Sequence, residues 1–88
     1  MQVKIVEDES KSLVIEFEGA DRSLVELIKE KLEDSKDVEF SSVEKDHPEV
    51  GVPRLVVKSS KNAKALVIKA IEQIEDELKE LAAEIPKK

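Results

Sequence analysis

The sequence contains one histidine, His47, and imidazole is the side chain best suited to acid–base catalysis near neutral pH. It lies between Asp46 and Pro48 in a segment predicted to be a loop. A general base or a metal site needs further side chains that converge on the imidazole, and no partner motif accompanies this one. We therefore expect His47 to cap backbone groups in a loop.

Other residues with catalytic or ligand chemistry also lack the spacing that such chemistry requires. The acidic run Glu7–Glu9 lacks the spaced oxygen ligands of a calcium loop, so we expect a solvated hairpin tip. The two glycines, Gly19 and Gly51, cannot form a glycine-rich phosphate loop, and no serine lies in a nucleophile-elbow motif. The sequence predicts no catalytic residue, no metal site and no cofactor.

Composition excludes further classes of protein. The 88 residues include 21 acidic and 15 basic side chains, so the net charge is −6 and direct, salt-driven binding to nucleic acid is not expected. Cysteine is absent, and no apolar run approaches the roughly 20 residues of a membrane span. We expect one domain over residues 1–88, soluble and cytoplasmic, with no signal peptide.

Alternation of apolar and polar residues predicts four strands. The first two, at residues 2–6 and 12–18, are expected to form a hairpin whose turn contains residues 7–10. The third begins near residue 37, and the fourth is centred on residues 55–57. The strand residues expected to form the sheet side of the core are Val3, Ile5, Leu13, Ile15, Phe17, Val38, Phe40, Leu55 and Val57.

Helical spacing of apolar residues predicts two helices. The first ends near Glu33, and its N-cap is either Asp21 or Ser23, the latter with Glu26 in a capping box. The second follows Asn62, a favourable N-cap, and is about 22 residues long. Its apolar residues are spaced 4, 3, 4, 3 and 4 apart, as in a coiled coil: Val67, Ile71, Ile74, Leu78, Leu81 and Ile85.

These elements predict an α+β fold of order β-β-α-β-β-α, in which a four-stranded antiparallel sheet carries two helices on one face. The predicted C-terminal helix is longer than the predicted sheet is wide. About 22 residues at 1.5 Å per residue span roughly 33 Å, which is more than the width of four strands spaced about 4.8 Å apart. Part of the apolar stripe between Ile74 and Ile85 should therefore extend beyond the core, where a partner would cover it.

Five short motifs follow one another along the chain at residues 16–19 (EFEG), 21–28 (DRSLVELI), 38–41 (VEFS), 47–48 (HP) and 62–66 (NAKAL). Together they resemble the small alpha-like subunit family of multisubunit RNA polymerases, to which archaeal subunit L belongs. That family has an acidic residue, then His, Ser or Thr, an apolar residue, a small residue and Asn at the start of a helix, followed by a Val-x-Phe strand opening. The resemblance covers essentially the whole chain, element by element.

The sequence also departs from the family pattern. Arg22 stands where the family usually has His, and Glu26 where it has Asn. In the capping-box alternative, Glu26 is explained by its spacing from Ser23. The missing Asn removes a polar group that family members can use at the dimer interface. Further departures are Val25, Lys29 and Glu49.

The resemblance implies a non-catalytic role. Family members pair through their two helices with the larger alpha-like subunit of the same polymerase, and the pair nucleates assembly of the large catalytic subunits. No contact with nucleic acid or membrane is implied. The residues expected at the partner interface are Leu24, Leu27, Ile28, Lys31, Ile74, Leu78 and Leu81.

Two other functions stay open at this stage. One is a stand-alone homodimeric α/β module that binds a ligand or another complex, and a homodimer of the isolated chain is also compatible with the polymerase role. The other is an enzyme that uses His47 with nearby carboxylates, which ranks last because the histidine has no recognisable partner motif. Light scattering combined with a pull-down separates the homodimeric module from the polymerase subunit.

Overall fold

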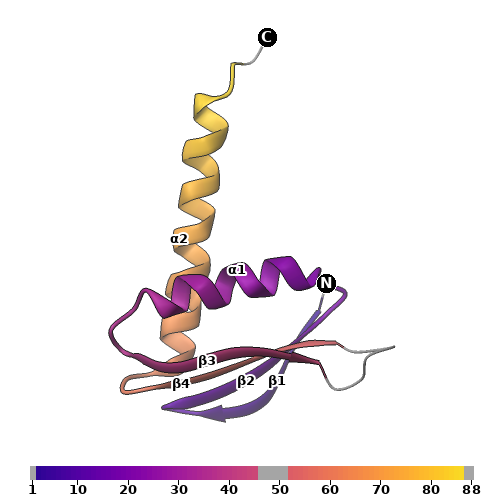
Figure 1. Ribbon diagram of the computed structural model, residues 1–88, viewed down its shortest axis with the longest axis vertical. Helices are drawn as coiled ribbons and strands as arrows, with labels where there is room; N and C mark the ends of the chain where they lie inside the picture. The colour runs from indigo at the N-terminus through magenta and orange to yellow at the C-terminus, as the bar shows by residue number, and fades with distance from the viewer. Residues whose placement is uncertain (1, 46–51, 87–88) are drawn as a thin grey trace.

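The computed structural model describes residues 2–45 and 52–86, and it consists of one sheet with two helices on one side (Figure 1). The elements are β1 (Gln2–Glu9), β2 (Ser12–Glu18), α1 (Arg22–Glu33), β3 (Val38–Lys45), β4 (Pro53–Ser59) and α2 (Ala63–Glu84). All neighbouring strands are antiparallel, in the order β1-β2-β4-β3. The predicted α+β fold, with a long C-terminal helix, is confirmed. Neither helix combines the length and the apolarity that crossing a membrane requires.

The core lies between the sheet and the two helices. Leu13 of β2 and Leu55 and Val57 of β4 are completely buried there, because alternate side chains of each strand point to the helix-covered face. Full burial of such an aliphatic side chain contributes about 1.5–3 kcal/mol. The predicted core positions in β2 and β4 are thus confirmed. The remaining core residues are Ile15, Phe17, Val25, Ile28, Leu32, Ala63, Val67, Ala70 and Ile74.

The first strand differs from the prediction in length. Pairing continues to Glu9, which lies opposite Ser12, so the predicted turn at residues 7–10 is wrong and the turn consists of Ser10 and Lys11. A bulge between Ile5 and Glu7 allows the strand to continue. The acidic run therefore lies within β1 and not at a hairpin tip.

Val3 and Ile5 are not core residues, contrary to the prediction. They lie opposite Phe17 and Ile15 and so share the helix side of the sheet, yet they are 56% and 45% exposed. The reason is that α1 packs over β3 and β4 and α2 over β2 and β4, which leaves the edge strand β1 without a covering helix.

The prediction for Phe40 is also wrong. A bulge between Val38 and Phe40 reverses the alternation, so that Val38 faces the helices opposite Ser59 while Phe40 lies opposite Lys58 on the uncovered face. Val38 is half-buried against the core, as expected, whereas Phe40 is 49% exposed.

Side-chain caps fix where both helices begin. Asp21 is the N-cap of α1, and its Oδ1 accepts hydrogen bonds from the Ser23 N–H at 2.8 Å and the Ser23 hydroxyl at 2.9 Å. Of the two predicted starts, the structure therefore has the one at Asp21. Glu26 does not complete a capping box, and its Oε1 lies 3.4 Å from Arg22 Nε. Asn62 caps α2 as predicted, since its Oδ1 accepts from the Ala65 N–H at 2.9 Å.

Candidate functional site

The residues considered for catalysis do not form a site in the described part of the chain. His47 lies outside the described residues, so the structure does not bear on it. In the acidic run, Glu7 accepts a hydrogen bond from the Ser12 hydroxyl, and the Asp8 carboxylate lies 2.8 Å from the Lys64 ammonium of α2. Within residues 2–45 and 52–86, no group of three or more His, Asp or Glu side chains is arranged to hold a metal ion. These acidic side chains serve as structural contacts.

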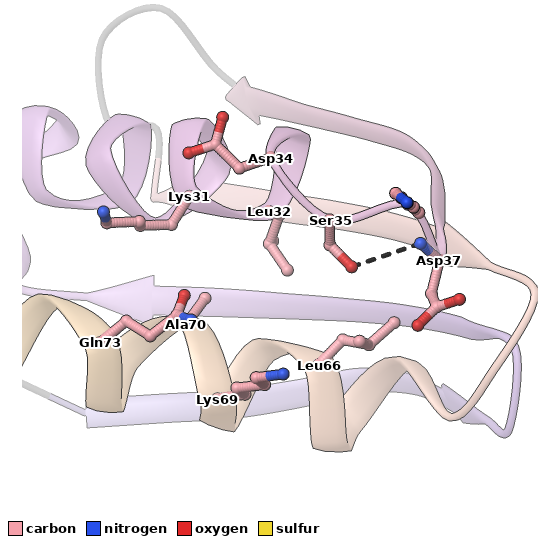
Figure 2. Close-up of a pocket in the computed structure, with 10 residues that line it drawn as sticks. Lys31, Leu32, Asp34, Ser35, Asp37, Leu66, Lys69, Ala70 and Gln73 are labelled. Atoms are coloured by element: carbon pink, nitrogen blue, oxygen red, sulfur yellow. Dashed lines mark hydrogen bonds between the residues drawn. The ribbon is translucent and has the colours of Figure 1, made fainter.

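A hollow of about 320 Å³ lies where the end of α1 meets the first half of α2 (Figure 2). Leu32 of α1 faces Leu66 and Ala70 of α2 across it. Charged residues of both signs surround the opening, and the hydrogen bond drawn there, from the Asp37 N–H to Ser35 Oγ, lies within the turn after α1. No nucleophile and base converge in the hollow, which is the seam between two packed helices. The lining residues are Lys31, Leu32, Asp34, Ser35, Lys36, Asp37, Leu66, Lys69, Ala70 and Gln73.

The uncovered face of the sheet carries a row of alternating charges. The strand pairing aligns Lys4, Glu16, Arg54 and Glu44 across all four strands. Arg54 Nη2 lies 2.7 Å from Glu16 Oε2 at the centre of this row. Opposite charges on neighbouring strands stabilise a sheet while they remain solvated. The helical side is therefore the better candidate for an apolar interface.

On α1, two leucines remain exposed beside the core. Leu24 and Leu27 are 37% and 39% exposed, and their spacing of three residues places them on one side of the helix. Lys31, four residues after Leu27, continues the same line. Ile28 faces the sheet and is buried, so it belongs to the core of the chain itself.

On α2, exposure changes sharply along one apolar stripe. Ile74 is 6% exposed, whereas Leu78, Leu81 and Ile85 are 57%, 56% and 61% exposed. Figure 1 shows the reason, because α2 starts at the sheet, crosses α1 and then continues away from both. The predicted overhang is therefore confirmed from Leu78 onward, while Ile74 lies in the core.

One ion pair joins the exposed parts of the two helices. The Lys31 ammonium donates to the Glu77 carboxylate, and this hydrogen bond raises the pKa of Lys31. Lys31 lies one turn after Leu27, and Glu77 lies one turn before Leu81, so the pair connects the two apolar strips. We call the combined area the α1–α2 surface; it consists of Leu24, Leu27, Leu78, Leu81 and Ile85.

The seven residues predicted for a partner interface thus fall into two groups. Leu24, Leu27, Leu78 and Leu81 are exposed and Lys31 is half-buried beside them, whereas Ile28 and Ile74 are buried in the core. Contact of any of them with a partner stays a prediction. Two residues of this region were not among the seven. Ile85 was predicted to belong to the overhanging stripe but was not assigned to the interface, and the pairing of Glu77 with a residue 46 positions earlier has no local signal.

Comparisons with known proteins give a family match, matches to solved structures and one negative result. The family described as RNA polymerase Rpb3/Rpb11 dimerisation domain matches residues 12–84, from the start of β2 to the end of α2. The crystal structure of DNA-directed RNA polymerase subunit L from Thermoplasma acidophilum superposes with a TM-score of 0.84 at 16% identity, covering 93% of this chain and 82% of the other. Among curated protein sequences, none matches significantly.

Proposed function

Since the chain belongs to the family of RNA polymerase Rpb3/Rpb11 dimerisation domains, we propose that it is a non-catalytic assembly subunit of a DNA-directed RNA polymerase. In this role it pairs through α1 and α2 with the larger alpha-like subunit of an archaeal polymerase. The pair then provides the scaffold on which the large catalytic subunits assemble in the cytoplasm.

The observation that carries the proposal is the exposed half of the stripe on α2. Leu78 and Leu81 of α2, and Ile85 directly after its end, are each more than half exposed, and no other part of the described chain covers them. Full burial of an exposed leucine contributes about 1.5–3 kcal/mol, so covering the remaining exposed half of each of these side chains contributes on the order of 1 kcal/mol toward a stable complex. Leu24 and Leu27 extend the same area onto α1.

The charge of the chain is consistent with such a position in the complex. With a net charge of −6, the chain would lose rather than gain energy beside a nucleic-acid backbone. Its place in a polymerase is therefore away from the DNA and against other subunits.

Co-expression with the larger alpha-like subunit, followed by size-exclusion chromatography, tests the proposal. The wild-type chain should co-elute with the partner in a 1:1 complex. Leu78→Glu should weaken the complex by at least about 2 kcal/mol, roughly 30-fold in Kd, because it places a charge in the centre of an apolar interface. Ile68→Glu is the matched control, since Ile68 is 51% exposed on the same helix but lies in its first half, ten residues before Leu78 and away from the overhanging stripe.

Two results would contradict the proposal in different ways. If Leu78→Glu binds the partner as tightly as the wild type does, the helical interface is wrong. If the wild-type chain forms a stable homodimer in light scattering and recovers no polymerase subunit, it is a homodimeric module. Circular dichroism of both variants checks that the sheet and helices remain folded.

A further inference from the structure

The charged residues that flank the exposed stripe of α2 are all acidic. With Leu78 at position a of the heptad and Leu81 at position d, the e and g positions are those that border a partner helix. The residues there are Glu75, Glu77, Ala82 and Glu84. Positions e and g set partner choice in coiled coils, because their charges meet across the interface.

The negative charge is concentrated in this half of the helix. Residues 72–84 contain six acidic side chains and one lysine, which leaves −5, whereas residues 61–71 contain three lysines and no acidic residue. Within the chain, Lys31 already neutralises Glu77. None of the ion pairs between described residues engages Glu75 or Glu84, and both are exposed.

We propose that the overhanging half of α2 selects a partner helix with lysine or arginine beside its apolar stripe and rejects a second copy of this chain. This inference rests on the proposed function, since it specifies the partner of the same surface. The apolar stripe supplies affinity for any amphipathic helix, and the acidic borders decide which helix is accepted.

The rejection of a second copy follows from helix geometry. In an antiparallel pair, position e meets e and position g meets g, so the glutamates at g would face the same glutamates of the second copy, and Glu75 would face a glutamate or an alanine. In a parallel pair, position g meets position e, and a second copy brings only Glu and Ala there. No arrangement along the stripe lets a second copy offer a positive charge at these borders, and like charges there are destabilising.

Two synthetic helical peptides of about 21 residues test the inference. Both carry Leu at a and d, and one carries Lys and the other Glu at e and g, with identical residues elsewhere. Fluorescence anisotropy at 50 mM NaCl should give binding of the Lys peptide about tenfold tighter than that of the Glu peptide. The preference should shrink at 500 mM NaCl, because salt screens exposed charges. Equal binding of the two peptides at low salt would overturn the inference.

A pair of double variants locates the effect. Glu75→Lys with Glu84→Lys should invert the peptide preference while leaving the Lys31–Glu77 pair intact. Glu72→Lys with Glu80→Lys makes the same change in net charge on the far side of α2 and should keep the wild-type preference. If the control inverts the preference as well, net charge and not the flanking positions decides, and the inference fails.

Sedimentation of the chain alone at 50 mM NaCl tests the rejection of a second copy, and the expected result is a monomer. A wild-type dimer that Leu78→Glu dissociates would overturn the inference. Its failure is distinguishable from that of the proposed function: pairing with the larger subunit can persist without any peptide preference. Conversely, a clear preference without pairing contradicts only the proposed function.

Discussion

The two halves of α2 continue one apolar stripe but have different environments. Up to Ile74, near the middle of the helix, the stripe is covered, with Val67 and Ile74 3% and 6% exposed, whereas beyond it Leu78 and Leu81 are 57% and 56% exposed. The spacing of the residues is the same in both halves. Periodicity thus reports which side chains share a face of a helix, but the rest of the chain determines whether that face is covered.

The two halves also differ in how they are attached. The first half is held by the Ala63 N–H, which donates to the Ser10 carbonyl at 2.7 Å, and by Lys64, which pairs with Asp8. In the second half, the ion pair that the described residues provide is the one between Glu77 and Lys31. The hairpin turn and β1 therefore position the start of α2, and the packing against α1 sets the direction of its projecting end.

The largest expected difference between the two halves is the effect of an alanine substitution on the free energy of unfolding. Ile74→Ala removes a buried side chain and should lower the free energy of unfolding by about 2–5 kcal/mol. Leu81→Ala, in the isolated chain, should change it by less than about 0.5 kcal/mol because the side chain is already in water. Urea unfolding followed by circular dichroism measures both. Similar losses for the two variants would mean that the second half is covered in the isolated chain.

The next largest effect on stability is expected at the N-terminal end of α2, which Asn62 caps. Asn62→Ala removes the side-chain acceptor for the Ala65 N–H and should cost about 1 kcal/mol of stability. Asn62→Asp is the matched control, because it keeps an acceptor and should behave nearly as the wild type does. The same urea experiment applies, and equal losses for Ala and Asp would show that the side-chain cap does not hold this end.

Much of the fold could be predicted from local patterns. The length of α2, its cap at Asn62 and the overhang beyond Ile74 all follow from residues that are neighbours along one helix. For the same reason, the core positions Leu13 and Leu55 could be found from strand alternation. These features depend on the spacing and type of residues, both of which can be read directly from the sequence.

The predictions of burial were wrong where a bulge interrupts the alternation of a strand, or where burial depends on elements that are distant in the sequence. The bulge before Phe40 moves that side chain to the uncovered face, and no residue type near it predicts a bulge. Ile5 alternates correctly but lacks a helix above it, which depends on how α1 and α2 cross the sheet. The Lys31–Glu77 pair likewise depends on the crossing of two helices. Alternation of apolar and polar residues therefore predicted too many core residues, both in the edge strand β1 and after the bulge in β3.

A smaller effect is expected at the ion pair that ties the projecting half of α2 to α1. Glu77 raises the pKa of Lys31 mainly by accepting its hydrogen bond, so Glu77→Gln should lower that pKa. A raised pKa means that the pair stabilises the fold below the unfolded value of 10.5 and that this contribution is lost as the pH rises through the higher folded value.

The stability difference between the wild type and Glu77→Gln should therefore begin to shrink above pH 10.5 and vanish only once the pH exceeds the higher folded pKa of Lys31. NMR titration of the Lys31 Nζ group measures the pKa directly, with Glu80→Gln as the control, since Glu80 is on the same helix but is not among the groups that raise the pKa of Lys31. An unchanged pKa of Lys31 in Glu77→Gln would show that the projecting half is not tied to α1 in this way.

The smallest effect concerns the start of α1, the helix that α2 crosses where its exposed half begins. The Ser23 N–H, and to a lesser extent the Ser23 hydroxyl, donate to Asp21 and lower its pKa below 3.8. A lowered pKa means that this cap stabilises the fold above pH 3.8 and that the contribution is lost as the pH falls through the folded value. Carboxyl-carbon NMR should therefore give Asp21 a pKa below 3.8, and Ser23→Ala should raise that pKa only in part, because the backbone donor remains. Asp21→Asn keeps the cap without titrating, so it should gain stability relative to the wild type only in acid. If Ser23→Ala restores the whole shift, the hydroxyl and not the backbone N–H is the main donor to Asp21.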